Sequence, residues 1–377
     1  MSLIGLELNG TRARAVIGPG EVPPRSLALD GKGGDLPMAL SLENRRPEVG
    51  RAGLALCRRL PHLTCMDFLA ELGERRQWGE GRKRIDAEKA LVLVFDHLRP
   101  ACKGAKGLVA TLPAYLNRAQ ADLVSKSAEK AKLPWSGSVS TPLAIGLAAH
   151  AEHPWEGRAL ILDVDDHALS WSAVEIGPER IFVVAEQSVR PLGLLAWKRR
   201  LLDALADRCI RHSRRDPRDS GQAEQALFDQ LDSVLDAASQ GQTAEAVVRA
   251  ATWFQDLLLR PEEIIQFCSP LVRQTLKELG QAPDLSQEGK ATRILLTEAA
   301  GRLSGLVPAL QEWREGDAEI SVLPPNALAK AAHDLAVRIS REELPHGHLD
   351  ATVSLTSRTT QPDTRTTKKR KISIFGE

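Results

Sequence analysis

The sequence has neither a net charge of any size nor many aromatic residues. Lys and Arg number 50 against 49 Asp and Glu, and aromatic side chains make up 4% of the 377 residues. A chain this balanced creates no overall field that would steer it to nucleic acid or to an anionic membrane. We therefore expect no membrane partner and no nucleic-acid partner.

Long apolar runs are missing too. No stretch reaches the roughly 18 consecutive apolar residues that a transmembrane helix needs. Residues 1–10 also lack the basic start and apolar core of a signal peptide. We expect a protein of the cytoplasm that does not enter a membrane.

Cysteine is scarce and shows no pairing pattern. None of the five cysteines belongs to a CxxC pair, and their number is odd, which argues against a disulfide framework and against a metal site. We predict reduced, buried thiols and no bound metal. The cysteines are Cys57, Cys65, Cys102, Cys209 and Cys268.

A repeated strand–turn–strand pattern is what the sequence does contain. Apolar and polar residues alternate over residues 3–8, and the turn signal Asn9-Gly10-Thr11 leads into a second strand. The pattern returns in the middle of the chain, which indicates an α/β protein made of two similar halves. The strands predicted from it cover residues 3–8, 12–16, 159–164, 169–176 and 181–186.

Amphipathic patterns predict helices between and after these strands. Apolar residues recur there with the 3–4 spacing of a buried helix face. The predicted helical regions are residues 51–103, 118–132, 142–150, 194–212, 224–238, 262–279, 301–313 and 325–339. Shorter strands are predicted at residues 107–112, 247–258, 294–296 and 320–323.

The end of the chain has a different composition. Residues 341–377 are rich in Ser, Thr and Arg, which predicts a flexible tail. The tail carries the basic run Lys368-Lys369-Arg370-Lys371. Because no aromatic platform accompanies this run, a solvated tail is favoured over a contact with nucleic acid.

One block resembles a known family. Residues 112–120 read Leu-Pro-Ala-Tyr-Leu-Asn-Arg-Ala-Gln, similar to the Pro-Ala-Tyr-Phe-Asn junction of DnaK-type heat-shock chaperones. Further segments resemble that family's nucleotide-binding domain in the same order along residues 3–340. They are residues 140–144, 161–163, 294–310 and 323–327. The family's substrate-binding domain has no counterpart here.

The resemblance implies an actin-like ATPase fold. Such a fold has two lobes, each with a mixed sheet flanked by helices, and a cleft between the lobes. Residues 1–157 would form lobe I, to which residues 320–340 would return. Residues 158–319 would form lobe II, and the tail would follow.

The resemblance also implies a site for ATP between two hairpin turns. Those turns must be rich in glycine, because backbone N–H groups approach the phosphates closely. In the first turn Glu7 stands where the family has Asp, and Asn9-Gly10-Thr11 replaces Gly-Thr-Thr. Glu7 and Asp163 are the only candidates for a catalytic role, through a hydrated Mg²⁺.

The second turn departs further from the family. Asp163 is kept, but Asp165, Asp166 and His167 replace three glycines. The added negative charges would repel a triphosphate, and their side chains would block its approach. A cation bridging the three aspartates is disfavoured, because this spacing is common in ordinary turns.

Other expected positions are changed as well. No lysine lies in the block 66–75, and Thr141, Ser170 and Asn326 stand where the family has acids. The adenosine motif keeps Gly301 and Arg302, which could stack on an adenine. The candidate nucleotide-binding residues are therefore Asn9, Gly10, Thr11, Asp163, Gly301 and Arg302.

These losses favour a DnaK-like pseudo-ATPase that acts as a protein-binding, scaffold or co-chaperone module. Positioning and electrostatics supply most of the catalysis in phosphoryl transfer, and both are weakened. Its partner would be another protein. An active ATPase that uses ATP or ADP with Mg²⁺ is the first alternative, and an actin-like assembly protein is the second.

Overall fold

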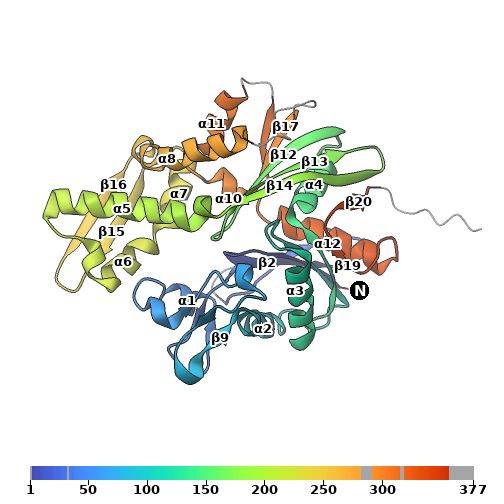
Figure 1. The fold of residues 1–377 in the computed structure, drawn as a ribbon, viewed down its shortest axis with the longest axis horizontal. Coiled ribbons are helices and arrows are strands. Elements are labelled where there is room, and N and C mark those ends of the chain that lie inside the picture. Colours follow the sequence, from blue (N-terminus) through green and yellow to red (C-terminus); the bar gives the residue numbers. More distant parts are fainter. Residues whose placement is uncertain (1, 32–33, 282–290, 315–317, 356–377) are drawn as a thin grey trace, which may run out of the picture.

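The computed structural model describes residues 2–31, 34–281, 291–314 and 318–355 of the chain. The fold is mixed α/β, with several sheets flanked by helices (Figure 1). Two of the sheets are large, with seven and six strands. Within the described residues, no helix is long and apolar enough to cross a bilayer.

The first large sheet is built around a fully buried strand, β1. This strand pairs antiparallel with β2 and parallel with β10, so a hairpin lies on one side of it and parallel strands on the other. The sheet order is β19-β11-β10-β1-β2-β3, and β4 pairs with β2. The strands are β1 (Leu3–Leu8), β2 (Arg12–Gly18), β3 (Arg25–Leu27), β4 (Leu36–Pro37), β10 (Gly107–Leu112), β11 (Trp135–Ser140) and β19 (Gly347–Leu349).

The second large sheet repeats this arrangement. Its first strand, β12, again pairs antiparallel with the next strand and parallel with a later one, in the order β18-β17-β12-β13-β14-β20. The repeated strand–turn–strand pattern of the sequence thus corresponds to the start of each sheet. The strands are β12 (Gly157–Val164), β13 (Leu169–Ile176), β14 (Arg180–Val189), β17 (Arg293–Leu296), β18 (Glu319–Val322) and β20 (Thr352–Ser354).

Helices and small sheets complete the fold. The helices are α1 (Arg51–Leu54), α2 (Ala87–Leu98), α3 (Arg118–Lys130), α4 (Thr141–Glu152), α5 (Leu194–Ser213), α6 (Gly221–Phe228), α7 (Leu231–Ser239), α8 (Pro261–Gly280), α10 (Glu298–Gly301), α11 (Leu306–Trp313) and α12 (Ala327–Ser340). The small sheets contain β5 (Leu40–Ser41), β6 (Glu48–Val49), β7 (Thr64–Cys65), β8 (Gln77–Trp78), β9 (Ile85–Asp86), β15 (Ala244–Arg249) and β16 (Phe254–Leu259). Short 3₁₀ helices cover Pro61–Leu63, Leu69–Glu71, Gly81–Lys83, Arg190–Leu192 and Pro217–Asp219.

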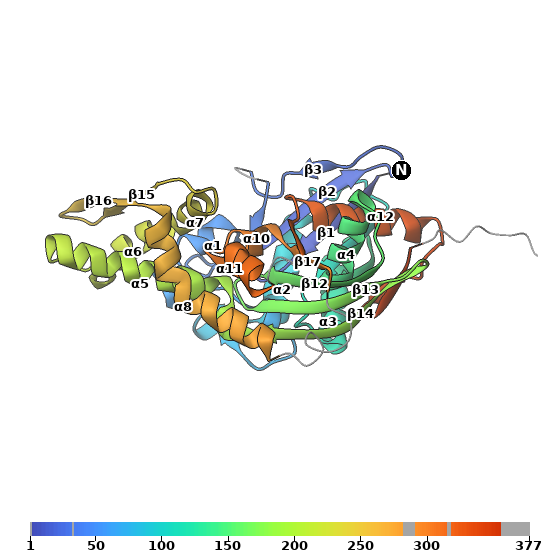
Figure 2. The same ribbon diagram turned by 90° about the horizontal axis from the view of Figure 1, so that it is seen from above.

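Helices α4 and α12 join the two large sheets through one apolar core. This core combines residues of the first sheet, such as Val109, with residues of the second, such as Ile161, and with Leu143 and Leu335 of the two helices. Figures 1 and 2 show both helices near the middle of the molecule, where the sheets come together. The sheets therefore share a core rather than folding as separate units.

A separate core supports the helices that follow the second sheet. Trp197 of α5 is fully buried there and donates its indole N–H to the carbonyl of Leu192 (3.1 Å). Helices α5, α6 and the β15–β16 hairpin extend to one end of the molecule in both ribbon views (Figure 2).

Several predicted elements differ from the structure. Much of residues 55–86 is irregular rather than α-helical, with short strands, turns and three short 3₁₀ helices. The predicted helix 224–238 is divided between α6 and α7. The predicted strand 247–258 is the hairpin β15–β16, which turns between the two strands. The predicted helix 301–313 is interrupted, because Gly305 adopts a left-handed φ of 84° before α11 begins.

The predicted tail begins later than residue 341. Strand β19 pairs parallel with β11, and β20 pairs antiparallel with β14, so two short edge strands lie inside the region predicted to be flexible. Backbone hydrogen bonds hold them despite their polar composition. Residues 356–377, which include the basic run, lie outside the described residues.

The four buried cysteines and half-buried Cys57 are all free thiols. Burial raises the pKa of the Cys57 thiol to about 11 and that of Cys268 to about 12. Thiols of this kind are poor nucleophiles at neutral pH, because the reactive form is the thiolate.

Replacement of Gly5 by Ala should destabilise the protein strongly. A Cβ atom at Gly5 would lie 1.9 Å from the carbonyl oxygen of Ala329 and 2.3 Å from the amide nitrogen of His333, both backbone atoms of α12. We expect a loss of at least about 2 kcal/mol in the free energy of unfolding, measured in urea. The control is Gly280→Ala at the end of α8, where no atom of the described residues lies within 4 Å of an added Cβ. Equal stability of the two variants would contradict the tight contact between β1 and α12.

Candidate functional site

The first turns of the two large sheets bind each other. The amide of Gly10, between β1 and β2, donates to Oδ2 of Asp165 (2.6 Å). In return the amide of Asp166, between β12 and β13, donates to the hydroxyl of Thr11 (2.8 Å). The structure therefore brings Gly10 and Thr11 next to the aspartate-rich turn, across 155 positions of sequence.

The carboxylate of Asp165 collects four hydrogen-bond donors. Besides Gly10, the hydroxyl of Tyr115 donates to Oδ2 (2.6 Å), and the amides of His167 and Ala168 donate to Oδ1 (2.9 and 3.1 Å). Asp165 is only 2% exposed. Burial raises its pKa, and the hydrogen bonds act in the opposite direction. A side-chain anion thus fills the space between the two turns.

Gly10 is the one position where this contact demands glycine. A Cβ atom there would lie 2.8 Å from Oδ2 of Asp165 and 3.2 Å from the hydroxyl oxygen of Tyr115. The glycine therefore allows a backbone N–H to reach an anion closely, as in a phosphate-binding turn. Here the anion is a carboxylate of the same chain.

The side chain of Asn9 stabilises the first turn. Its side-chain oxygen accepts the amides of Thr11 and Arg12 (3.0 and 2.9 Å), and its side-chain nitrogen donates to Glu7 (3.0 Å). This is the local pattern by which Asn supports tight turns.

Glu7 and Asp163 lie close together, as expected for the ends of β1 and β12. Burial raises the pKa of Asp163 to about 7, and the negative charges of Asp165 and Glu7 add to the shift, while a hydrogen bond with Thr297 opposes it. The hollow that Glu7, Asp163 and Thr297 line has a volume of only about 10 Å³. That is scarcely the space that one water molecule needs.

Arg302 does not join this group. Its guanidinium donates to the backbone carbonyl and to Oδ1 of Asp232 (3.1 and 3.0 Å) and is paired with Asp236, both on α7. Gly301 faces Val322, because a Cβ there would lie 2.6 Å from that side chain. The position predicted to stack on an adenine is therefore used to hold α10 to α7.

Lys198 completes an ion-pair network that sequence reasoning missed. This buried lysine of α5 donates to Oδ2 of Asp232 (2.8 Å). Burial acts to raise the pKa of Asp232, but Lys198 and Arg302 outweigh it, so the pKa is lowered. The network joins α5, α7 and α10 next to the aspartate-rich turn.

A second missed group links His167 to the irregular region before α2. The ring nitrogen Nδ1 of His167 lies 2.8 Å from Oδ1 of Asp67, and the ring lies 4.7 Å from that of Tyr115. Arg190 approaches Asp67 and Glu71 at 3.4 and 3.5 Å. Asp67 lies in the block 66–75, where the resemblance implies a lysine. That expectation was the signal in the sequence that pointed to this region.

Arginines of β2 form a third link between the two sheets. Arg14 donates to Glu298 of α10 (2.8 Å) and, with two nitrogens, to Asp35 (2.8 and 2.7 Å). Arg12 approaches the same glutamate at 3.4 Å. The bidentate pair with Asp35 is geometrically specific and orients the Arg14 guanidinium. Its remaining nitrogen, Nη1, then donates to Glu298 and links β2 to α10.

No protein family matches this sequence, and no curated protein is significantly similar to it. The resemblance to DnaK-type chaperones therefore rests on the sequence segments quoted above. Asp165 and Asp232 at the site are hydrogen-bonded or paired within the chain. Oδ1 of Asp166 is buried without a hydrogen-bond partner among the described residues.

The ionisation of Asp163 should lower the free energy of unfolding as the pH rises. A carboxyl group with a pKa near 7 in the folded state and near 4 in the unfolded state holds more protons when folded, so between these values the free energy of unfolding decreases with pH. We expect Asp163→Asn to gain roughly 2–4 kcal/mol relative to the wild type between pH 4.5 and pH 8. Urea unfolding at several pH values measures this.

The exposed Asp219 provides the control for this experiment. Asp219→Asn should follow the wild-type pH profile. Part of the pH dependence should persist in Asp163→Asn, because burial also raises the pKa of Asp166, to about 6. Parallel pH profiles for Asp163→Asn and the wild type would contradict the raised pKa of Asp163.

Removal of the Asp165 carboxylate should loosen the contact between the two turns. Asp165→Ala leaves four buried donors without their acceptor, and we expect a loss of about 2–5 kcal/mol in the free energy of unfolding. Asp165→Asn keeps the shape and one acceptor and should lose less. Equal losses in both variants would contradict the role of the Asp165 carboxylate as the acceptor for these donors.

Proposed function

We propose that this chain is a pseudo-ATPase with an actin-like fold, similar to DnaK-type chaperones, and that it acts as a protein-binding or scaffold module. The two large sheets share the order of five strands, β11-β10-β1-β2-β3 and β18-β17-β12-β13-β14, and differ in the edge to which the last strand is added. This shared order supports the proposal, because an actin-like fold is built from two similar halves. Residues 1–157 and 320–340 would form one lobe and residues 158–319 the other. The packing of α12 against β1 and β10 supports the return of the chain to the first lobe. The return begins after β18, because this strand pairs with β17 in the second sheet.

The observation that carries the proposal is the closed contact between the two turns. In a nucleotide-binding protein of this class, phosphate groups would lie between the hairpins. Here the carboxylate of Asp165 takes the donors. Two hollows lined by residues of the turns have volumes of about 10 and 150 Å³. A nucleotide would need a volume of several hundred Å³.

Charge opposes the alternative of an active ATPase. A triphosphate would have to displace Asp165 and would then face Glu7, Asp163 and Asp166 at short range. In a site of low effective dielectric such repulsion is severe. The cations of the region, Arg14, Lys198 and Arg302, are already paired with carboxylates of the chain.

Without a nucleotide cycle, the fold would serve as a surface for a partner protein. The pairs that close the turns connect segments from both proposed lobes, so they would keep the lobes in a fixed relative position. A fixed arrangement suits a scaffold, because no binding energy is needed to order it.

The test is the melting temperature with millimolar ATP or ADP, each with and without Mg²⁺. We expect no shift, because a ligand that binds the folded state would raise the midpoint in proportion to its affinity. A saturable stabilisation by ATP would overturn the proposal if it disappeared in Glu7→Gln or Asp163→Asn. Mg²⁺-dependent release of phosphate from ATP, abolished by Asp163→Asn, would do the same.

A further inference from the structure

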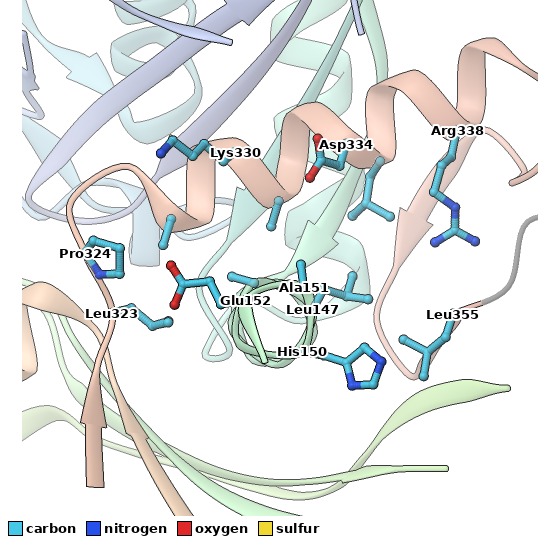
Figure 3. A pocket seen from close by; sticks show the side chains of 14 residues that line it. Leu147, His150, Ala151, Glu152, Leu323, Pro324, Lys330, Asp334, Arg338 and Leu355 are labelled. Carbon is cyan, nitrogen blue, oxygen red and sulfur yellow. The ribbon is translucent and has the colours of Figure 1, made fainter. Parts of the chain in front are cut away.

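A groove separate from the turns lies between α4 and α12. Its volume is about 500 Å³, within the range of sites for small organic ligands. Leu147 and Ala151 of α4 line one wall, and Ala331 and Leu335 of α12 line the other (Figure 3). Leu355 lies at one end of this groove, so the α4–α12 groove is apolar along most of its length.

The two ends of the α4–α12 groove carry different charged groups. Lys330 and Glu152 lie near Pro324 at one end, where opposite charges offset each other (Figure 3). At the other end Arg338 and His150 lie on either side of Leu355. The side chain of Asp334, between the ends, is 68% exposed, so water screens its charge.

Arg338 is incompletely paired. Its Nη2 atom is buried and has no hydrogen-bond partner among the described residues. Its Nε atom is 3.6 Å from Oε2 of Glu343, a distance too long for a hydrogen bond. Figure 3 shows the guanidinium directed toward the space between His150 and Leu355. A buried donor without an acceptor is unfavourable. The Arg338 side chain also lines the groove, so an anionic group of a ligand there would offset the charge of the guanidinium.

We propose that the α4–α12 groove binds an amphiphilic carboxylic acid, with its apolar chain between the two helices and its carboxylate on the guanidinium of Arg338. A volume of about 500 Å³ lies within the range of sites that hold small organic ligands. A monocarboxylate with a chain of medium length meets this size. Glu343 neutralises part of the Arg338 charge, so the apolar chain supplies most of the affinity and the carboxylate supplies the preference for an anion.

Such a ligand would touch both helices that join the two large sheets. The walls of the groove belong to α4 and α12, and the buried sides of these helices form the core shared by the sheets. Binding therefore stabilises the folded protein and raises its melting temperature. This site is independent of the turns around Asp165, so it does not rest on the proposed function.

The experiment titrates the full-length protein with decanoate in a calorimeter, below the concentration at which decanoate forms micelles. Decanol and decyltrimethylammonium, which have the same chain, test the charge. We expect a single site with a dissociation constant on the order of 10–100 µM for decanoate. Decanol should bind roughly 5- to 10-fold more weakly, and the cation should bind weakest.

Three variants locate the site. Ala151 is exposed at the groove wall, so Ala151→Trp fills the groove without entering the core and should weaken decanoate binding at least about 10-fold. Arg338→Met should remove the preference for decanoate over decanol. Arg341→Met, directly after the same helix and outside the lining of the groove, is the matched control and should bind decanoate as the wild type does.

Circular dichroism and the melting temperature without ligand establish that each variant is folded. Absence of decanoate binding to the wild type would overturn the proposal, and so would undiminished binding to a folded Ala151→Trp variant. Equal binding of the cation and decanoate, or an unchanged preference in Arg338→Met, would show that Arg338 does not receive the carboxylate.

Discussion

The carboxylate of Asp165 is buried between the two sheets, so it is stable there only where hydrogen-bond donors reach its oxygens. Its oxygens are removed from water and would be strongly unfavourable without hydrogen bonds. The donors come from the first hairpin, from Tyr115 after β10 and from the backbone of its own turn. Three segments that are far apart in sequence must therefore meet at one point. The ion pairs of Asp67, Glu298 and Asp232 lie around this point and depend on the same meeting of the sheets.

The elements that rest on local pattern were predictable from the sequence. Alternation over residues 3–8 and 159–164 marks the two hairpins, and the Asn117 and Gln120 side chains form the capping box that begins α3. Strand β11 was missed, because a run with three serines has little β propensity and is held by its neighbours β10 and β19. The late strands β19 and β20 were missed for the same reason.

The candidate site was predicted only in part. The sequence indicated that Gly10, Thr11 and Asp163 would lie near each other, since each ends or follows the first strand of a sheet. It did not indicate that Asp165 would bind Gly10, because that contact depends on the relative placement of two sheets. The pairing of Arg302 with α7 was equally hidden, since nothing in the local sequence distinguishes an arginine that binds a ligand from one that binds Asp232.

The strands β19 and β20 have a mechanical consequence. Only residues 350 and 351 separate them, yet β19 belongs to the first large sheet and β20 to the second. This two-residue connection ties the two sheets together, and the distance it spans cannot grow unless one of the two strands detaches from its sheet. Any motion that moved the two sheets apart would therefore stretch this connection and pull the three-residue strands β19 and β20 away from their neighbours. A tether pulling on the end of the chain would be borne by the same few hydrogen bonds, so tension there would reach both sheets at once.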